Sequence, residues 1–417
     1  MLKNINSMKE HYHRTTCRIC NSSDLKKFLD LGKSPLANAL VNKKNLNKKD
    51  KTFPLAVYFC QNCSLVQVSD VVDPRMLFSD YYFITSASSP SVDHFKKYAQ
   101  DILKNFIKSS GDLVVDIGGN DGTLLNELKN DSRVLNVDPA TNIAKISKKK
   151  GIKTVNDFFS KKLVTDHLLR NFGKADVVTA NNIIAHTDTV IDLFKGVKEF
   201  LTPGGVFIFE THWVRNLVEE RAFDQVYHEH LSYYSLHALK HLVESVGLSV
   251  FDVKTVPIQG ESIRIYVSNN RKSKPSVKKF LAREKSLGLH KFKVFSDFSK
   301  KVLESKNIML KLLASLKENG KKIVGYGAPA KGTTFLNFFG IGKDTIDYII
   351  DTTSIKQGLF MPGVHIPIYP PEKLLESKPD YILILAWNYA DSILKKEKDL
   401  IESGVKFIIP VPKIKIV

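Results

Sequence analysis

The sequence lacks long apolar runs and contains little cysteine, methionine or tryptophan. Its apolar stretches are short, as at residues 381–387, whereas a membrane-spanning helix needs about 20 apolar residues. Residues 1–17 contain no apolar segment of the kind that forms the core of a secretory signal. We therefore expect no membrane association, a cytoplasmic location and, in that reducing compartment, no disulfides.

Acidic residues are also few. The 43 Asp and Glu residues stand against 62 Lys and Arg, which gives a formal net charge of +19. The lysines are scattered and are not interleaved with aromatic residues, so the charge indicates a solvated surface that favours small anionic substrates, and we expect no nucleic-acid partner. With 43% hydrophobic and 25% charged residues in 417, the composition excludes disorder and predicts two or three globular domains.

Four regions differ in their sequence pattern. Residues 1–75 are polar and contain every cysteine. Residues 76–270 alternate strand-like and helical segments, which is typical of βαβ units on a parallel sheet. Residues 271–315 continue from the polar stretch 268–275 and are predicted as a helical linker, and residues 316–417 show a second alternation. The sequence therefore predicts an α/β protein with two α/β domains behind a small N-terminal domain.

The expected strands and the linker helix follow from apolar periodicity. Strands are predicted at 113–118, 134–138, 175–182 and 205–210 in the first α/β domain, and at 322–327, 346–351, 381–387 and 406–412 in the second. In the linker, six apolar side chains recur at helical spacing: Phe295, Phe298, Val302, Met309, Leu312 and Leu316. This spacing predicts a long helix with one apolar stripe that packs on a core.

All four cysteines fall in two CxxC pairs, Cys17 with Cys20 and Cys60 with Cys63. Two such pairs supply the four thiolates of a tetrahedral Zn²⁺ site, although the 39 residues between them exceed the usual spacing of about 15–20. A redox pair and four unrelated thiols are the alternatives, but redox chemistry needs one pair and unrelated thiols would not all share this spacing. We predict a structural zinc site, because four cysteine ligands leave no open coordination position.

A glycine-rich turn follows the first expected strand. Residues 116–122 read DIGGNDG and lead from the strand into a helix. Glycines let the backbone approach a ligand at the carboxyl end of a parallel strand. Asp138 closes the next strand, 22 residues after Asp116, where an acidic side chain can hold ribose hydroxyls. The arrangement predicts a nucleoside ligand, with NAD as one candidate.

The acid inside the strand makes this turn more similar to the S-adenosylmethionine loop of class I methyltransferases than to the GxGxxG loop of NAD proteins. Asn181 and Asn182 end the strand before the next helix, and Thr-Pro-Gly-Gly at 202–205 precedes the following strand, as in those enzymes. This resemblance implies S-adenosylmethionine as the cofactor. Its expected contacts are Asp116, Gly118, Asn120, Gly122, Asp138 and Asn181.

A second cluster of reactive side chains lies at residues 224–234, which contain two histidines, one glutamate and three tyrosines. Histidine removes protons near neutral pH, and a neighbouring phenol can stabilise an oxyanion. The His-Glu-His order lacks the i, i+4 histidine pair of HExxH metal sites. A cluster of structural histidines is the alternative. His186 follows the strand at 175–182 and is expected to join the cluster.

The two CxxC pairs, DIGGNDG, YHEHLSYYSL at 227–236 and GYGAPAKG at 325–332 together resemble the C-methyltransferases of nucleotide-linked deoxysugars, which methylate C3 of 4-keto hexoses. The resemblance covers almost the whole chain. It implies a class I S-adenosylmethionine-dependent methyltransferase domain with a Rossmann-like fold, flanked by a small N-terminal zinc-binding domain and a C-terminal Rossmann-like domain that holds the sugar nucleotide. It also implies a nucleotide-linked ketosugar as partner and a monomer or small homo-oligomer.

The same resemblance assigns catalytic roles. It makes His230 the base that takes the C3 proton and places Tyr227, Glu229 and His186 around the resulting enolate. Tyr81 matches the family's aromatic position after the zinc domain, with Tyr82 as its neighbour. Stabilisation of the enolate oxygen is what makes a proton α to a carbonyl acidic enough for a side-chain base. The step as implied requires no metal.

The C-terminal motifs are expected to bind the diphosphate. Backbone N–H groups at Gly327 and the start of the following helix, aided by Lys331, suit such a group. Lys356 and Gln357 are expected to add a second contact, and His365 lies in a further loop that is similar to the family's. The alternative is a Rossmann-like scaffold that binds nothing.

One position departs from the family pattern. Residues 259–267 read QGESIRIYV, and Glu261 stands where the family more often has a glycine. A carboxylate near the site would interact differently with an amino or a hydroxyl group of the sugar. The nucleotide, the sugar substituents and the stereochemistry at C3 therefore stay open. A sugar O-methyltransferase and a zinc-bearing RNA-binding protein or RNA methyltransferase are the alternative functions.

Overall fold

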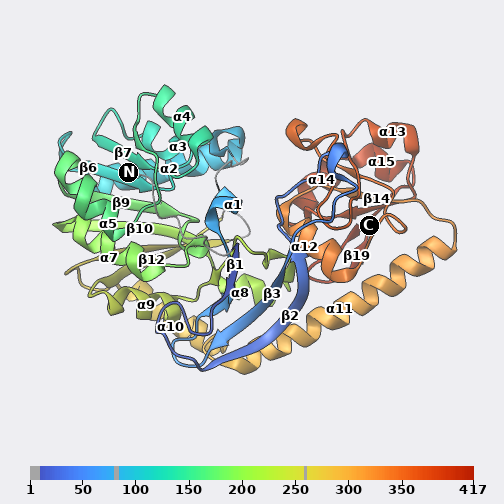
Figure 1. Cartoon of the computed structure of the whole chain (residues 1–417), viewed down its shortest axis with the longest axis horizontal. Coiled ribbons are helices and arrows are strands. Elements are labelled where there is room, and N and C mark those ends of the chain that lie inside the picture. The colour runs from blue at the N-terminus through green and yellow to red at the C-terminus, as the bar shows by residue number, and fades with distance from the viewer. Residues whose placement is uncertain (1–9, 79–83, 258–260) are drawn as a thin grey trace.

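The computed structural model describes residues 10–78, 84–257 and 261–417. Two α/β bodies lie side by side, and the N-terminal ribbon of β2 (Leu25–Pro35) and β3 (Thr52–Cys60) runs between them (Figure 1). The long helix α11 (Phe292–Glu318) passes beneath the ribbon from one body to the other. Across the described ranges, no helix combines the length and apolar character needed to cross a membrane.

The first α/β body is built on a seven-stranded sheet with the order β12-β13-β10-β9-β6-β7-β8. Only β13 pairs antiparallel with its neighbours β10 and β12, and the other pairs are parallel. The strands are β6 (Leu113–Ile117), β7 (Arg133–Val137), β8 (Lys153–Val155), β9 (Ala175–Asn181), β10 (Leu201–His212), β12 (Ser249–Val256) and β13 (Ser262–Ser268). The chain order reverses between β6 and β9, which is where open α/β sheets bind ligands.

Both faces of this sheet are covered, because successive side chains of a strand point to opposite faces. Val114 and Val177 point to the face of the sheet that α2 (Ser89–Phe106) and α3 (Thr123–Asn126) cover. Val115 and Val178 point to the opposite face, which α7 (Val190–Phe200) and α9 (Leu236–Ser245) cover. Further helices follow the strands: α4 (Thr141–Lys149), α5 (Lys161–Leu163), the π-helical turn Val164–Leu168 and α6 (Leu169–Phe172). The expected βαβ architecture is confirmed.

The N-terminal sheet contains a strand that the sequence did not predict. Its order is β11-β4-β3-β2, where β4 is Val66–Val68 and β11 is Ser232–Tyr233. β11 lies inside the histidine- and tyrosine-rich segment and pairs antiparallel with β4. A separate pair, β1 (His11–His13) and β5 (Asp70–Val72), and the short helix α1 (Pro74–Phe78) complete this part of the chain. The reactive segment therefore contributes the short edge strand β11 to the N-terminal sheet.

The expected linker consists of two helices, α10 (Pro275–Ser286) and α11. Phe295, Phe298, Val302 and Met309 of α11 are buried, as the apolar stripe predicted. The Phe28 ring of β2 lies 5.3 Å from Phe295, centroid to centroid. Leu312 and Leu316 are only partly buried at the edge of the same core. The stripe thus joins the N-terminal ribbon to the second α/β body.

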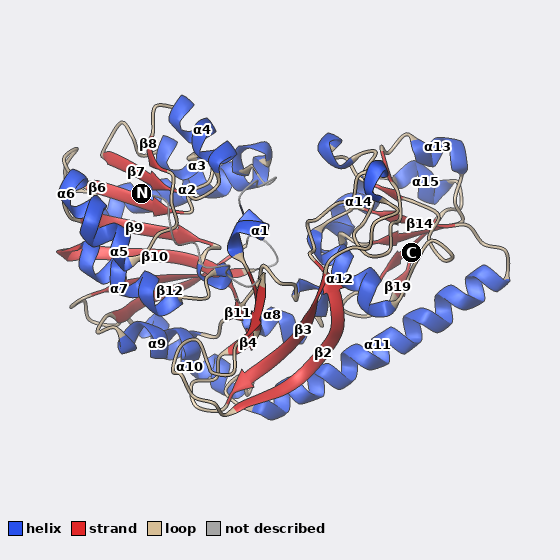
Figure 2. Cartoon of the chain, viewed as in Figure 1, coloured by secondary structure: helices blue, strands red, loops and turns tan. Residues whose placement is uncertain are grey.

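The second α/β body has a six-stranded sheet of order β16-β15-β14-β17-β18-β19, parallel except for the edge strand β19 (Figure 2). Its strands are β14 (Ile323–Tyr326), β15 (Ile349–Ile350), β16 (Ile368–Tyr369), β17 (Tyr381–Ile384), β18 (Lys406–Ile409) and β19 (Lys415–Ile416). Its helices are α12 (Ala330–Phe339), α13 (Lys373–Ser377), α14 (Ala390–Lys396) and α15 (Lys398–Glu402). The expected second Rossmann-like sheet is confirmed.

Candidate functional site

The glycine-rich turn lies at the carboxyl end of β6, beside the point where the strand order reverses. Gly118 and Gly122 have φ of +63° and +77°, in the left-handed region that favours glycine. A Cβ atom at Gly119 would lie 2.6 Å from Oδ1 of Asn136. The turn therefore requires glycines and leaves its backbone exposed to close approach by a ligand.

Two carboxylates line this edge. Asp116 is buried and accepts a hydrogen bond of 2.7 Å from the Thr179 hydroxyl, and burial raises its pKa to about 7. Asp138 accepts backbone N–H groups on both oxygens, from Asn120 at 3.0 Å and from Ala140 at 2.9 Å. Asp138 thus shapes the glycine-rich turn, and each of its oxygens keeps a second lone pair for a ligand hydroxyl.

Unpaired amide groups mark the same edge. Among the described residues, Nδ2 and Oδ1 of Asn181 and Oδ1 of Asn182 are buried without a hydrogen-bond partner. Leaving such atoms unpaired costs about 1–3 kcal/mol each. Together with the turn and Asp138, these atoms fit a ligand with ribose hydroxyls and further polar groups, as S-adenosylmethionine has.

Three histidine rings gather beyond the ends of β9 and β10. His186 ends the 3₁₀ turn Ile184–His186, His212 is the last residue of β10, and His230 precedes β11. The His230 ring centroid lies 5.0 Å from that of His186 and 5.5 Å from that of His212. Burial lowers the pKa of all three imidazoles, that of His212 to about 4 and that of His230 well below its ordinary value. All three rings are therefore neutral at pH 7.

Hydrogen bonds fix the tautomer of His230. Nδ1 lies 2.9 Å from the carbonyl oxygen of Gln225, which can only accept, so Nδ1 carries the proton of the neutral ring. Nε2 is then the acceptor and lies 2.9 Å from the Tyr227 hydroxyl. His230 thus presents a basic nitrogen that already faces a phenol.

The other reactive side chains of the segment face the N-terminal sheet. His228 lies 3.1 Å from the Pro54 carbonyl oxygen through Nε2 and packs on the Phe53 ring. The Glu229 carboxylate accepts bonds of 2.7 and 3.0 Å from Nδ2 of Asn38, and burial raises its pKa to about 7. The Glu229 carbonyl oxygen lies 2.6 Å from Nδ1 of His186. Among the expected catalytic side chains, the structure therefore brings His230, Tyr227 and His186 together.

Tyr81, the remaining expected catalytic residue, lies outside the described residues.

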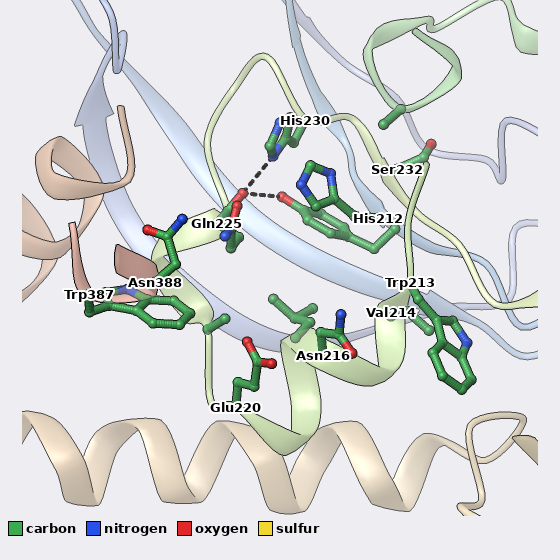
Figure 3. A pocket seen from close by; sticks show the side chains of 14 residues that line it. His212, Trp213, Val214, Asn216, Glu220, Gln225, His230, Ser232, Trp387 and Asn388 are labelled. Carbon is green, nitrogen blue, oxygen red and sulfur yellow. Dashed lines mark hydrogen bonds between the residues drawn. The ribbon is translucent and has the colours of Figure 1, made fainter. Parts of the chain in front are cut away.

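A pocket opens between the two α/β bodies beside His230 (Figure 3). His212 and His230 lie on one side of the pocket, and Trp387 and Asn388, from the 3₁₀ turn Trp387–Tyr389, lie on the other, with Gln225 beside Asn388. The helix α8 (Val214–Glu219) and Glu220 close the base. The pocket thus joins the ends of both parallel sheets.

Sequence reasoning missed most of the residues that line this pocket, among them His212, Glu220, Trp387 and Asn388. His212 had a usable signal, since it is a polar residue directly after an apolar strand, at the edge where ligands bind. The other three reach the pocket only through the packing of the two bodies.

Lys331 faces this pocket wall. Its Nζ lies 2.5 Å from Oδ1 of Asn388 and 3.8 Å from the centroid of the Trp387 ring. Burial lowers its pKa to about 8. The Trp387 indole in turn donates a 2.6 Å bond to Asp224, which belongs to the first body. Lys331 therefore lies at the junction of the two bodies.

The other expected sugar-nucleotide contacts separate into two places. Lys356 donates to the Ala328 carbonyl oxygen at 2.9 Å and lies 3.6 Å from an Asp351 oxygen, and Gln357 donates to the Asp351 carbonyl at 2.9 Å. Both therefore lie beside the glycine loop that contains Gly327, whose φ is +85°. His365 instead pairs with Asp50 of the N-terminal region at 2.9 Å.

Glu261 has a φ of +71°, in the left-handed region where glycine is unstrained. A glycine would be unstrained at this position. The Glu261 carboxylate accepts a 2.6 Å bond from Arg215 of α8. The added carboxylate is therefore paired with a cation beside the pocket base.

The four cysteines form a closed cluster. Their sulfur atoms all lie within 4.8 Å of one another. The two CxxC turns are alike, since Asn21 donates to the Cys17 carbonyl at 3.0 Å and Ser64 to the Cys60 carbonyl at 2.9 Å. Hydrogen bonds with Cys17 and Cys63 hold the pKa of Cys60 well below its usual range. Four buried or half-buried thiols at this spacing fit a tetrahedral Zn²⁺ ion with no open position.

Elemental analysis of freshly purified, reduced protein is expected to return about one zinc per chain. Cys63→Ser should lose most of that zinc and lower the thermal midpoint, because metal binding is coupled to the folding of such a site. Ser23→Ala, at an exposed position shortly after the first CxxC turn, is the control and should keep the metal. A wild-type protein without zinc would overturn the assignment.

Comparisons with known domain families place three consecutive matches on the chain. Residues 17–78 match a zinc binding domain, residues 92–253 a methyltransferase domain and residues 257–412 a C-methyltransferase C-terminal domain. Among solved structures, a S-adenosylmethionine-dependent methyltransferase from Clostridium acetobutylicum covers 42% of this chain and 92% of its own, with 17% identity and a TM-score of 0.34. Magnesium protoporphyrin IX methyltransferase from Synechocystis covers 47% of this chain and 89% of its own, with 12% identity and a TM-score of 0.33.

A curated relative matches almost the entire sequence. It is the C-methyltransferase NovU from Streptomyces niveus, which is 33% identical over 405 residues, or 96% of both chains. The order of the three domain matches along the chain agrees with this full-length similarity. The chain therefore belongs to the family of S-adenosylmethionine-dependent C-methyltransferases that combine a zinc-binding domain, a methyltransferase domain and a C-methyltransferase C-terminal domain.

Proposed function

We propose that the protein methylates C3 of a nucleotide-linked 4-keto-deoxysugar through an enolate, in the biosynthesis of a branched deoxysugar. The observation that carries this proposal is the buried, neutral His230, whose Nε2 faces the Tyr227 hydroxyl beside the pocket. A C-methyltransferase must create a carbon nucleophile, and a neutral imidazole beside a phenol is suited to form one next to a ketone.

In the proposed reaction the ketosugar lies in the pocket with its C3–H bond directed at Nε2 of His230. The proton passes to Nε2, and the electron pair of the C–H bond moves into the enolate. The Tyr227 hydroxyl then no longer donates to Nε2. It donates its hydrogen bond to the enolate oxygen instead. S-adenosylmethionine, held by the turn at Gly118–Gly122 and by Asp138, would supply the electrophilic methyl group for this carbon nucleophile. His186 and His212 stay neutral and keep the site free of competing charge.

We assign the cofactor to the edge of the first sheet. The turn with Gly118, Asn120 and Gly122 would approach it closely, and Asp138 would bind ribose hydroxyls. Asp116 and the unpaired amide of Asn181 lie at the same edge. The support is the fit of these groups to a polar nucleoside, described above.

The sugar nucleotide is assigned to the second sheet. The loop at Gly327 and the side chains of Lys356 and Gln357 would hold its phosphates, and Lys331 would approach the sugar from the pocket wall. His365 joins this set only by resemblance, since its ring is paired with Asp50.

Asp138→Ala should weaken S-adenosylmethionine binding about 10- to 100-fold, because hydrogen bonds to a charged group contribute about 1.5–3 kcal/mol. Titration calorimetry measures the change. Asp131→Ala, at an exposed position before β7, should leave the affinity unchanged. Equal affinities of wild type and Asp138→Ala would remove Asp138 from the cofactor site.

His230→Ala should reduce methyl transfer by about 10²–10⁴-fold, the usual contribution of a positioned general base. Without S-adenosylmethionine, wild-type protein should exchange the C3 proton of a nucleotide-linked 4-ketosugar with deuterated water, as followed by NMR, and His230→Ala should not. His228→Ala is the matched control and should exchange normally, because that ring faces the N-terminal sheet.

Methylation by the wild type without any exchange or deuterium uptake at the α-carbon would favour a sugar O-methyltransferase. Undiminished exchange by His230→Ala would assign the proton transfer to another group.

A further inference from the structure

Arg18 is a fully buried cation inside the first CxxC turn, between Cys17 and Cys20. Its backbone N–H donates to Oε1 of Gln67 at 3.0 Å, and its side chain leaves the cysteine cluster toward β4 and β11. Burial lowers its pKa from the ordinary value, and Asp188 opposes this shift. A buried guanidinium is retained only where its donors are paired.

The guanidinium reaches three separate segments. Nη2 donates to the Val68 carbonyl oxygen of β4 at 2.9 Å, and Nη1 donates to the Leu231 carbonyl oxygen at 2.5 Å. Nε donates to the Asp188 carboxylate at 3.2 Å. One side chain therefore connects the zinc-binding domain with two loops of the methyltransferase domain.

Those two loops carry the histidines of the site. Leu231 directly follows His230, and Asp188 lies two residues after His186. The loops also bond to each other, since the Leu231 N–H donates to the Ala185 carbonyl at 2.8 Å. Arg18 thus contacts the Leu231 backbone of one loop and the Asp188 carboxylate of the other.

We propose that Arg18 is a positioning residue that fixes the His186 and His230 loops relative to each other, so that the zinc-binding domain sets the geometry of the active site. The proposal rests on the proposed role of His230. A planar fork with several donors can hold two carbonyls and a carboxylate at once, whereas a lysine ammonium cannot reproduce that geometry. Small displacements of a catalytic group reduce the rate of chemistry far more than binding.

The test compares the same substitution at two arginines that share one partner. Arg14 also pairs with Asp188, at 3.2 Å, but its Nε donates to the Thr16 carbonyl, within its own segment. Arg18→Lys should lower kcat about 10- to 100-fold while KM for both substrates stays within about threefold. Arg14→Lys should change kcat less than about twofold. Zinc content and thermal midpoint are measured for both variants.

A second readout needs neither substrate nor cofactor. The Nδ1–H groups of His186 and His230 both lie against carbonyl oxygens in the structure, so their NMR signals report the loop geometry directly. Arg18→Lys should shift these signals or speed their exchange with water, whereas Arg14→Lys should not. This readout stays valid even if the ketosugar is not the substrate, so it separates failure of this proposal from failure of the proposed function.

Asp188→Asn provides a second route if Arg18→Lys does not fold, because it loosens the same guanidinium from the His186 loop. It should lower kcat and shift the His186 signal in a protein that keeps its zinc. Folded, zinc-loaded Arg18→Lys or Asp188→Asn protein with wild-type imidazole signals and wild-type kcat would overturn the proposal. Equal losses in Arg14→Lys and Arg18→Lys would do the same.

Discussion

Exclusion of water from the His230 imidazole is the constraint on which the site depends. Burial keeps the ring neutral at pH 7 by lowering its pKa, and the neighbouring His186 and His212 add to that effect. The carbonyl of Gln225 then fixes the tautomer that leaves Nε2 basic. A histidine in open water would be partly protonated near its ordinary pKa of about 6.5 and would have no fixed tautomer.

No single part of the chain buries His230. The first sheet contributes His212, and the N-terminal sheet takes the residues after His230 as its edge strand β11. The second α/β body contributes Trp387, which donates to Asp224 of the first body, and Thr334 of α12, which donates to the Val226 carbonyl at 3.0 Å. The segment around His230 is therefore shared by all three domains, which gives a physical reason for the zinc-binding domain to be part of the enzyme.

Local pattern was enough to predict much of this molecule. The strands with continuous apolar sequence, the stripe on α11 and the four cysteines each depend on spacing within a short segment, and each lies where it was expected. The glycines of the cofactor turn were recognisable because a left-handed backbone admits few other residues.

Long-range packing accounts for what could not be predicted. β11 contains only two residues, and its partner β4 is far away in the sequence. Arg18 lies between two cysteines in the sequence, and nothing local indicates that its side chain reaches Leu231. Lys331 and His365 were both expected to contact the sugar nucleotide, yet Lys331 faces Asn388 at the pocket and His365 pairs with Asp50. Their directions depend on how the domains pack.

The pH dependence of C3 proton exchange shows whether the buried, neutral His230 is the base. A histidine base acts only when its ring is neutral, and the lowered pKa of His230 means that the ring stays neutral as the pH falls through 6.5. Exchange is therefore expected to persist below pH 6 and to be lost only at more acidic pH. The opposite result would be an exchange rate that falls as the pH drops through 7 in the wild type but not in Glu229→Gln. That result would assign the proton transfer to Glu229, whose pKa burial raises to about 7.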